Sequence, residues 1–237
     1  MSVVAVHGLW MRGTSMLAVK RRLEARGYRG YAFNYPSVRG SLEANAAALA
    51  QFVDGVPGDV VHLVGHSLGG VLIRTMLERG VPVRLGRVVC LGSPLRGSRT
   101  AARLARLPGG RWLVGKALME HNARGGFDNW STAVEVGSIA GRWPFGVGRV
   151  FGPFPEPNDG TVAVAETELS GLRDHVVLPV SHVALLWSTQ VAAQMEHFLA
   201  HGRFSRAASN LARLIFCTQK VHFSITPPGR TDTSGLN

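Results

Sequence analysis

The sequence of 237 residues is poor in cysteine and has no long apolar segment. Its two cysteines, Cys90 and Cys217, are too few for a disulfide framework and lack metal-ligand spacing, which excludes a disulfide-rich fold and a cysteine metal centre. The apolar runs fall far short of the roughly 20 residues that a membrane-spanning helix needs. The first residues, MSVVAVHG, have neither the basic segment nor the cleavage site of a signal peptide. We therefore expect a globular protein of the cytoplasm.

Acidic residues are also scarce, because 15 of them stand against 26 lysines and arginines and leave a net charge of +11. The imbalance is strongest from Arg96 to Lys116, a stretch with five arginines, one lysine and no acid. A basic excess is typical of proteins that bind nucleic acids, membrane surfaces or acidic substrates, and a GC-rich genome is the alternative explanation. Because zinc-finger spacing and the aromatic signature of RNA-binding domains are absent, we expect no nucleic acid partner.

What the sequence does contain is a regular alternation of short apolar segments and longer segments of helical period. Apolar segments predict strands at residues 3–7, 31–35, 59–65, 87–93, 133–141 and 175–180, and helical patterns predict helices at 14–26, 41–53, 68–80 and 185–202. Strands that are apolar throughout and separated by helices indicate a mostly parallel sheet covered on both faces. The predicted fold class is therefore α/β.

Three stretches depart from this pattern. Residues 95–133 contain two helical segments around a Pro-Gly-Gly break, and so long a connection between strands predicts a cap over the edge of the sheet. Residues 142–160 are rich in Pro and Gly and predict a loop. The pattern ends at Gly202, so we expect one domain over residues 1–202 and a partly disordered appendage over 203–237.

Ser67 is the candidate nucleophile. It stands in LVGHSLGGV, where a predicted strand meets a predicted helix and Gly65 and Gly69 flank the serine at two residues' distance. So sharp a turn needs small neighbours, and it lifts the hydroxyl above the carboxyl edge of the sheet at a helix N-terminus. Chance occurrence of G-x-S-x-G among 29 glycines is the alternative, and the strand and helix on either side argue against it.

A serine needs a base and an orienting acid. His182 follows the last predicted strand, at the same edge of the sheet as Ser67, and is the candidate base; a structural histidine is the alternative. Asp159 follows the preceding strand in PNDGTV and is the candidate acid, with an ordinary Asx turn as the alternative. The acids to test in its place are Glu156, Glu166 and Asp174.

The oxyanion of a tetrahedral intermediate needs hydrogen-bond donors. We expect one donor to be the backbone N–H of Leu68, directly after the nucleophile, and the other to be the N–H of Leu9, with Trp10 as second choice. His7 and His66 flank these loops and are interpreted as supporting residues. Their spacing to other histidines and acids predicts no metal site.

Five segments, in order along the chain, resemble the α/β-hydrolase superfamily and within it the small bacterial lipases and esterases. They are HGLW, GHSLGG, LGSPLRGS, PNDGTV and SHVALL. The resemblance covers most of residues 3–202 and implies a compact sheet of about six strands, because the sequence starts directly at the strand before the oxyanion loop. The chain departs from the lipase pattern G-T-P-H-x-G-S, with Ser93 in place of threonine and Leu95 in place of histidine.

The resemblance implies a serine carboxylic-ester hydrolase that works through an acyl-enzyme on short- to medium-chain esters or lipids, without a cofactor. Trp10, Met11 and Leu95 would then contact the acyl chain, with core packing as the alternative for each. The cap at 95–133 would act as a lid, and its arginines would touch an anionic membrane surface or merely face solvent. A thioesterase, amidase or acyltransferase with the same triad, and a binding protein without turnover, remain alternatives. Acyl-chain length and oligomeric state stay open.

Overall fold

A computed structural model describes residues 1–145 and 156–206 of the chain. The chain divides into one unit over Met1–Ser205 and a second that begins at Arg206. Nearly all of the expected appendage at 203–237, and the middle of the expected loop at 142–160, therefore lie outside the described residues. The fold and the candidate site belong to the first unit.

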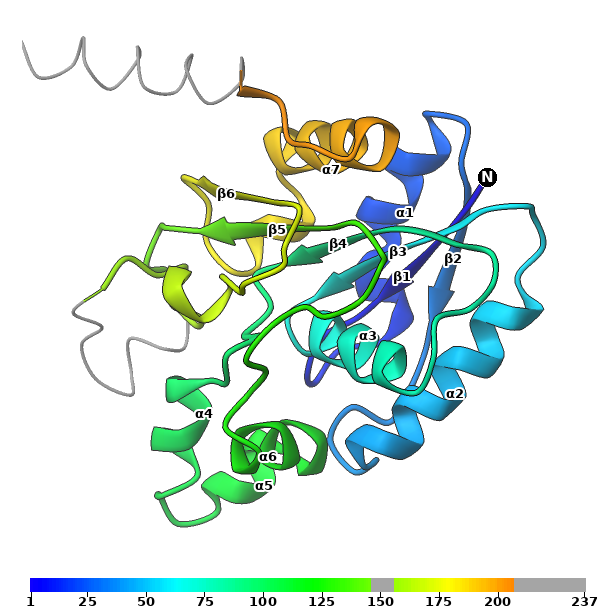
Figure 1. Ribbon diagram of the computed structural model, residues 1–237. Helices are drawn as coiled ribbons and strands as arrows, with labels where there is room; N and C mark the ends of the chain where they lie inside the picture. The colour runs from blue at the N-terminus through cyan, green and yellow to red at the C-terminus, as the bar shows by residue number, and fades with distance from the viewer. Residues whose placement is uncertain (146–155, 207–237) are drawn as a thin grey trace, which may run out of the picture. The chain divides into compact units, whose positions relative to one another are not determined.

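Six strands form one parallel sheet in the order β2-β1-β3-β4-β5-β6 (Figure 1). The strands are β1 (Ser2–Val6), β2 (Arg29–Phe33), β3 (Val61–His66), β4 (Leu85–Leu91), β5 (Val136–Gly141) and β6 (Asp174–Leu178). The helices are α1 (Leu17–Glu24), α2 (Leu42–Gly55), α3 (Leu68–Glu78), α4 (Arg99–Leu104), α5 (Gly110–Val114), α6 (Lys116–Ala123) and α7 (Thr189–His201), with short 3₁₀ helices η1 (Gly13–Met16), η3 (Val164–Glu166) and η4 (Ala184–Leu186). Within the described ranges, none of these helices combines the length and the apolar character that crossing a bilayer requires.

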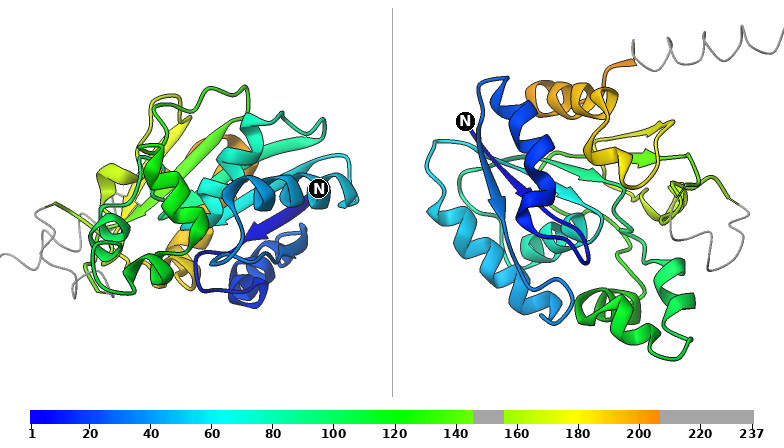
Figure 2. Two further views of the ribbon diagram at one scale, coloured as in Figure 1. Left: turned by 90° about the horizontal axis from the view of Figure 1, so that it is seen from below. Right: turned by 180° about the vertical axis from the view of Figure 1, so that it is seen from behind.

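Helices cover both faces of the sheet, which explains why its strands are apolar throughout. In β1, Val4 and Val6 pack in one core cluster with side chains of α2 and α3, while Val3 and Ala5 pack in another with side chains of α1 and α7. Figures 1 and 2 show these two pairs of helices on opposite sides of the sheet. The predicted α/β class with a parallel sheet of about six strands is confirmed. Because all six strands run the same way, the loops after them meet along one rim.

The second strand lies two residues earlier than the sequence pattern predicts. It pairs with β1 from Arg29 to Phe33, because β1 ends at Val6 and offers no partner further along. Tyr35 leaves the sheet, and its hydroxyl donates to the backbone oxygen of His7 at 2.8 Å. The loop after β2 is thereby held against the loop after β1.

Residues 95–133, the segment predicted to be a cap and called the cap below, contain three short helices rather than the two expected. Gly109 and Gly115 both have φ of 71°, a left-handed conformation that separates α5 from α4 and from α6. The cap contacts the rest of the domain where α2 begins, since the side chain of Glu120 accepts from Leu42 N at 2.7 Å. Figures 1 and 2 place α5 and α6 beside that end of α2.

Candidate active site

Ser67 occupies a strained turn between β3 and α3. Its backbone has φ of 54° and ψ of −120°, a conformation that non-glycine residues rarely adopt. The flanking glycines are required by close backbone packing, because a Cβ on Gly65 would lie 2.5 Å from Gly70 N and one on Gly69 would lie 2.2 Å from Val6 O. The expected sharp turn is therefore present. Strain of this kind concentrates at functional sites.

His182 and Asp159, the expected base and acid, form a buried hydrogen bond. Nδ1 of His182 donates to Oδ2 of Asp159 at 2.7 Å, and the two residues are only 8% and 1% exposed. The other carboxylate oxygen, Oδ1, accepts from the backbone N–H groups of Thr161 at 2.9 Å and Val162 at 2.7 Å. Because Nδ1 carries the hydrogen of the bond to Asp159, Nε2 of the neutral ring presents a lone pair that can take up a proton.

The three acids named as alternatives to Asp159 bind other groups instead of His182. Glu156 forms an ion pair with Arg99 near the surface. Glu166 is buried and accepts from the backbone N–H groups of Arg99 and Ala163, and burial raises the pKa of its carboxyl group. Asp174 accepts from the backbone of the residue after it and of Phe204. Asp159 is thus the carboxylate that contacts His182 through its side chain.

His66 joins the serine turn to the loop that carries His182. Its Nε2 donates to the backbone oxygen of His182 at 3.1 Å, and the centroids of the two imidazole rings lie 4.8 Å apart. Burial lowers the pKa of His66 to about 3, so this ring stays neutral at physiological pH. This contact agrees with the interpretation of His66 as a supporting residue, because His66, directly before the candidate nucleophile, holds the backbone of the candidate base.

Gly92 was not singled out from the sequence, yet it lies against the His182–Asp159 pair. A Cβ at this position would lie 3.0 Å from Asp159 Oδ2 and 3.2 Å from His182 Nδ1, and its φ of 55° is left-handed. The preceding residue accepts from the backbone N–H of Ser67 at 2.9 Å. The sequence does hold a signal for this position, because Gly92 is the first glycine of LGSPLRGS and interrupts the end of a predicted strand.

The loop after β1 lies beside the serine in a fixed conformation. A Cβ on Gly8 would be 3.1 Å from the Cβ of Ser67. Nδ1 of His7 donates to the backbone oxygen of Gly8 at 2.8 Å. In a trans peptide the N–H points away from the C=O, so the N–H of Leu9 faces away from the His7 ring. The hydrogen bond to Gly8 O thereby fixes the orientation of this peptide.

The second expected donor is the N–H of Leu68, the first residue of α3. N–H groups in the first turn of a helix have no partner within the helix, and they carry the positive end of its dipole. The N–H of Leu68 directly follows Ser67, while the Leu9 N–H belongs to a loop that approaches Ser67 at Gly8.

The three residues expected to contact an acyl chain differ in exposure. Trp10 is 51% exposed and Met11 is partly buried, and both line a groove beside the loop after β1. Leu95 is fully buried in the core cluster that contains α2 and α3, which corresponds to the packing alternative rather than to contact with a ligand. Within residues 1–145 and 156–206, no three His, Cys, Asp or Glu side chains gather closely enough to hold a metal ion.

The sequence matches the alpha/beta hydrolase family over residues 3–218, and it has no significant match among curated proteins. The lipase BlEst2 of Bacillus licheniformis has a similar structure, with a TM-score of 0.67 and 20% identity over 85% of this chain and 91% of the lipase. A metagenomic carboxyl esterase has a TM-score of 0.59 and 18% identity, covering 93% and 76%. The RedJ thioesterase of Streptomyces coelicolor has a TM-score of 0.54 and 18% identity, covering 84% of each chain. Because the family match spans most of the sequence, the chain belongs to the alpha/beta hydrolase family.

Proposed function

We propose that this protein is a serine carboxylic-ester hydrolase with Ser67 as nucleophile, His182 as base and Asp159 as orienting acid. The observation that carries the proposal is the buried 2.7 Å bond from His182 to Asp159, on the loop that His66 ties to the serine turn. An imidazole fixed by a carboxylate at one nitrogen has the other available as a general base.

In the proposed reaction, the Ser67 hydroxyl attacks the ester carbonyl while Nε2 of His182 removes its proton. The imidazolium that forms is stabilised by Asp159, and it then protonates the leaving alcohol. The product is an acyl-enzyme on Ser67. Water, activated by the same imidazole, attacks this acyl group and releases the carboxylic acid. No cofactor takes part.

The oxyanion of each tetrahedral intermediate would accept from the N–H groups of Leu9 and Leu68. Backbone donors held in place before the reaction need no reorganisation, and each contributes about 3–4 kcal/mol to stabilisation of the transition state. The hydrogen bond from His7 to Gly8 O supports this role, because it holds the peptide between Gly8 and Leu9 in one orientation.

A thioesterase is the second candidate, since the same residues would cleave a thioester by the same steps. It is favoured by the likeness in fold to a thioesterase, whereas the likeness to a lipase and a carboxyl esterase favours oxygen esters. An amidase, an acyltransferase and a binding protein without turnover are further alternatives. Kinetics on a matched ester, thioester and amide of one acyl group separate the reactions by their leaving groups.

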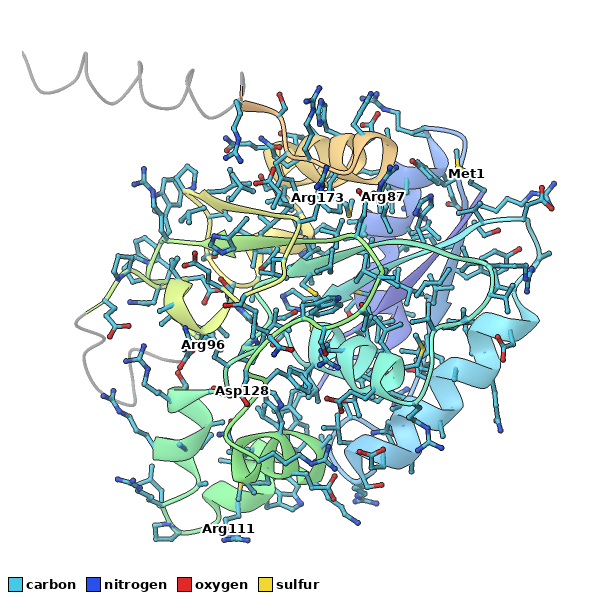
Figure 3. All side chains as sticks on the ribbon, viewed as in Figure 1. Met1, Arg87, Arg96, Arg111, Asp128 and Arg173 are labelled. Carbon is cyan, nitrogen blue, oxygen red and sulfur yellow. The ribbon has the colours of Figure 1, made fainter. Side chains whose placement is uncertain are left out.

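The tip of the cap is proposed to touch anionic membrane surfaces weakly. Arg106, Arg111 and Lys116 are exposed and form no ion pair within the described parts of the chain, beside the exposed side chains of Leu107 and Trp112. Figure 3 shows Arg111 at the outer end of α5. Cations beside apolar side chains are typical of peripheral membrane contacts. Arg99, by contrast, is neutralised by Glu156 and Glu166.

The decisive experiment is hydrolysis of 4-nitrophenyl esters from acetate to palmitate by the wild-type protein and by Ser67→Ala. We expect activity on short and medium chains and a loss of roughly 10⁴-fold or more in the variant. A fluorophosphonate probe should label the wild-type protein at Ser67 only. Turnover by Ser67→Ala equal to that of the wild type, or failure of the probe to label Ser67, would contradict the proposal.

A further inference from the structure

A groove of about 540 Å³ lies at the rim of the sheet, on the side of β1 and β2. Its walls come from the loop after β1, the loop after β2 and helix α5. It contains two arginines, several apolar or aromatic side chains and no acid. The lining residues are Trp10, Met11, Arg12, Asn34, Tyr35, Pro36, Ser37, Val38, Arg39 and Trp112.

The groove is electrically positive because its two arginines are not neutralised. Arg12 and Arg39 are both exposed, and neither forms an ion pair with any residue that the structure describes. Other arginines of the domain do have a carboxylate partner, as Arg87 has in Glu135 at 2.7 Å. Guanidinium groups without such a partner favour carboxylate or phosphate ligands.

Two tryptophans give the groove an apolar wall. Trp10 has φ of 59°, so its conformation is unfavourable for a residue with a side chain. Its indole is nevertheless held in place, since Nε1 donates to Leu113 O at 2.7 Å and the ring packs edge-on against Trp112 at 4.9 Å. A strained and half-exposed tryptophan costs stability, and an observed strain of this kind points to a functional position.

The groove lies within reach of the proposed nucleophile. β1 is hydrogen-bonded to β3, which leads to Ser67, and β2 lies next along the sheet. Neighbouring strands are about 4.8 Å apart, so β1 and β2 lie roughly 5 and 10 Å from β3, which leads to Ser67. Only Leu9 separates Trp10 from Gly8, where an added Cβ would lie 3.1 Å from the Cβ of Ser67. A substrate with one end in the groove and its ester bond at Ser67 would have to span this separation.

We infer that this groove binds the charged end of an amphiphilic anion, a carboxylate or phosphate on an apolar stem whose ester bond lies at Ser67. Arg12 and Arg39 would bind the charge, and Trp10 and Trp112 would cover the stem. The inference rests on the proposed function, to which it adds a substrate class: esters that carry a negative charge a few bonds away from the reacting carbonyl.

The test measures binding without turnover, by tryptophan fluorescence and calorimetry on Ser67→Ala. The probes are octyl phosphate, octanoate, octyl glucoside and inorganic phosphate, each below its micelle concentration at low salt. We expect the two octyl anions to bind about tenfold or more tightly than octyl glucoside, and inorganic phosphate to bind weakly. Comparison of octyl phosphate with octanoate tells which anion the groove prefers.

The matched variants are Arg12→Gln with Arg39→Gln in the groove, and Arg21→Gln with Arg29→Gln elsewhere. Arg21 lies exposed on α1, and Arg29 lies at the opposite end of β2. The groove pair should abolish the preference for anions, and the control pair, which removes the same charge, should keep it. Equal binding of octyl glucoside and octyl phosphate, inorganic phosphate as tight as octyl phosphate, or an anion preference that survives the groove pair would overturn the inference.

Hydrolysis of neutral 4-nitrophenyl butyrate by the wild-type protein separates this inference from the function on which it rests. Ester hydrolysis without any anion preference would overturn the groove and leave the hydrolase. Selective binding of anions by a protein that labels with no fluorophosphonate and cleaves no ester would overturn the hydrolase and its link to the groove, while the anion site itself would stand.

Discussion

The two halves of the sheet's rim are built in opposite ways. On the side of β3 to β6, the His182–Asp159 pair is almost fully buried, and backbone N–H groups bind the carboxylate. On the side of β1 and β2, Trp10 is half exposed and strained, and Arg12 and Arg39 project from exposed loops. Buried contacts fix the first half, whereas the second half presents exposed aromatic and cationic side chains to solvent.

This difference corresponds to two tasks. A proton relay works only if its groups keep hydrogen-bonding geometry, so burial and backbone contacts that fix them are an advantage. Recognition of a substrate needs contact with solvent and tolerates movement. We therefore expect changes on the β3–β6 half to lower the rate of the chemical step, and changes on the β1–β2 half to alter which substrates bind.

The largest effect is expected from Asp159→Asn, which replaces a carboxylate that accepts two backbone N–H groups and one imidazole N–H. An amide in this place favours the wrong tautomer of His182, and kcat should fall about 10⁴-fold. Steady-state kinetics on 4-nitrophenyl butyrate, with circular dichroism to verify folding, measure the effect.

Glu156→Gln is the matched control for Asp159→Asn. It also removes one carboxylate from the same loop region, but from an ion pair with Arg99 at the surface. The control should retain nearly full activity. If both variants lost activity equally, or if Asp159→Asn stayed active, Asp159 would not be the orienting acid.

The next largest effect is expected from Gly92→Ala. The added methyl group would lie 2.6 Å from Leu185 Cδ1 and 3.0 Å from Asp159 Oδ2, so the side chains around the His182–Asp159 pair must shift. Misplacement by about 1 Å costs roughly 100-fold in rate. The left-handed φ of 55° adds a loss of about 1–2 kcal/mol in the free energy of unfolding.

Gly27→Ala separates the two consequences of that substitution. Gly27 also has a positive φ, 87°, but a Cβ there would meet no atom within 4 Å. In urea denaturation, Gly27→Ala should lower the free energy of unfolding by about as much as the left-handed φ does in Gly92→Ala. Its kcat/KM should equal that of the wild type. A loss of activity in Gly27→Ala as large as in Gly92→Ala would mean that lower stability, rather than crowding of the pair, causes the effect.

Ser67 and Gly92 show what the sequence could predict and what it could not. The fold followed from strands that are apolar throughout, and the turn at Ser67 followed from a local pattern of glycines. The closeness of Gly92 to His182 depends on how the loops after β4 and β6 meet, and residues so far apart leave no local pattern. Leu95 illustrates a second limit, since an apolar residue near the rim can equally well line a groove or, as here, pack in the core.

The cap shows a third limit, which comes from single glycines. Residues 111–121 have a continuous helical pattern, but Gly115 takes φ of 71° and ends α5 there. The backbone N–H of the next residue, Lys116, donates to Val38 O at 2.7 Å. This tertiary hydrogen bond outweighs the local preference for one continuous helix. Helix α5, which carries Trp112 beside Trp10, ends at this break.

The burial of several histidines further predicts loss of stability in acid. Burial lowers the pKa of His62 to about 4, below the 6.5 of an unfolded chain. The unfolded state therefore binds more protons between these values, and stability falls as the pH drops from 6.5 to 4, by up to about 1.4 kcal/mol per pH unit for one histidine. Burial lowers the pKa of four other histidines in the same direction: His7, His66, His121 and His175.

Urea denaturation at a series of pH values measures this slope. His62→Asn keeps an acceptor for the N–H of Arg87, which His62 Nδ1 accepts at 2.9 Å, and should reduce the slope by up to one proton. The raised pKa of Glu166 acts in the opposite direction, as a loss of stability when the pH rises above 4.5. An identical slope in His62→Asn would show that His62 binds its proton equally well in the folded and the unfolded protein.

The smallest effect is expected at the cap, where exposed cations act on a membrane surface. Reversal of two of them, Arg106→Glu with Arg111→Glu, should lower binding to vesicles that contain anionic lipid, since each such cation contributes about 1 kcal/mol near the surface. Co-sedimentation at low and physiological salt measures the loss, which should shrink as salt screens the charges. Arg21→Glu with Arg29→Glu changes the net charge by the same amount away from the cap, and it separates a local surface from a general effect of a basic protein. If the two pairs of substitutions weakened vesicle binding equally, the membrane contact would come from net charge alone. The cap would then have no membrane surface of its own, and the β1–β2 half of the rim would differ from the β3–β6 half only in substrate recognition.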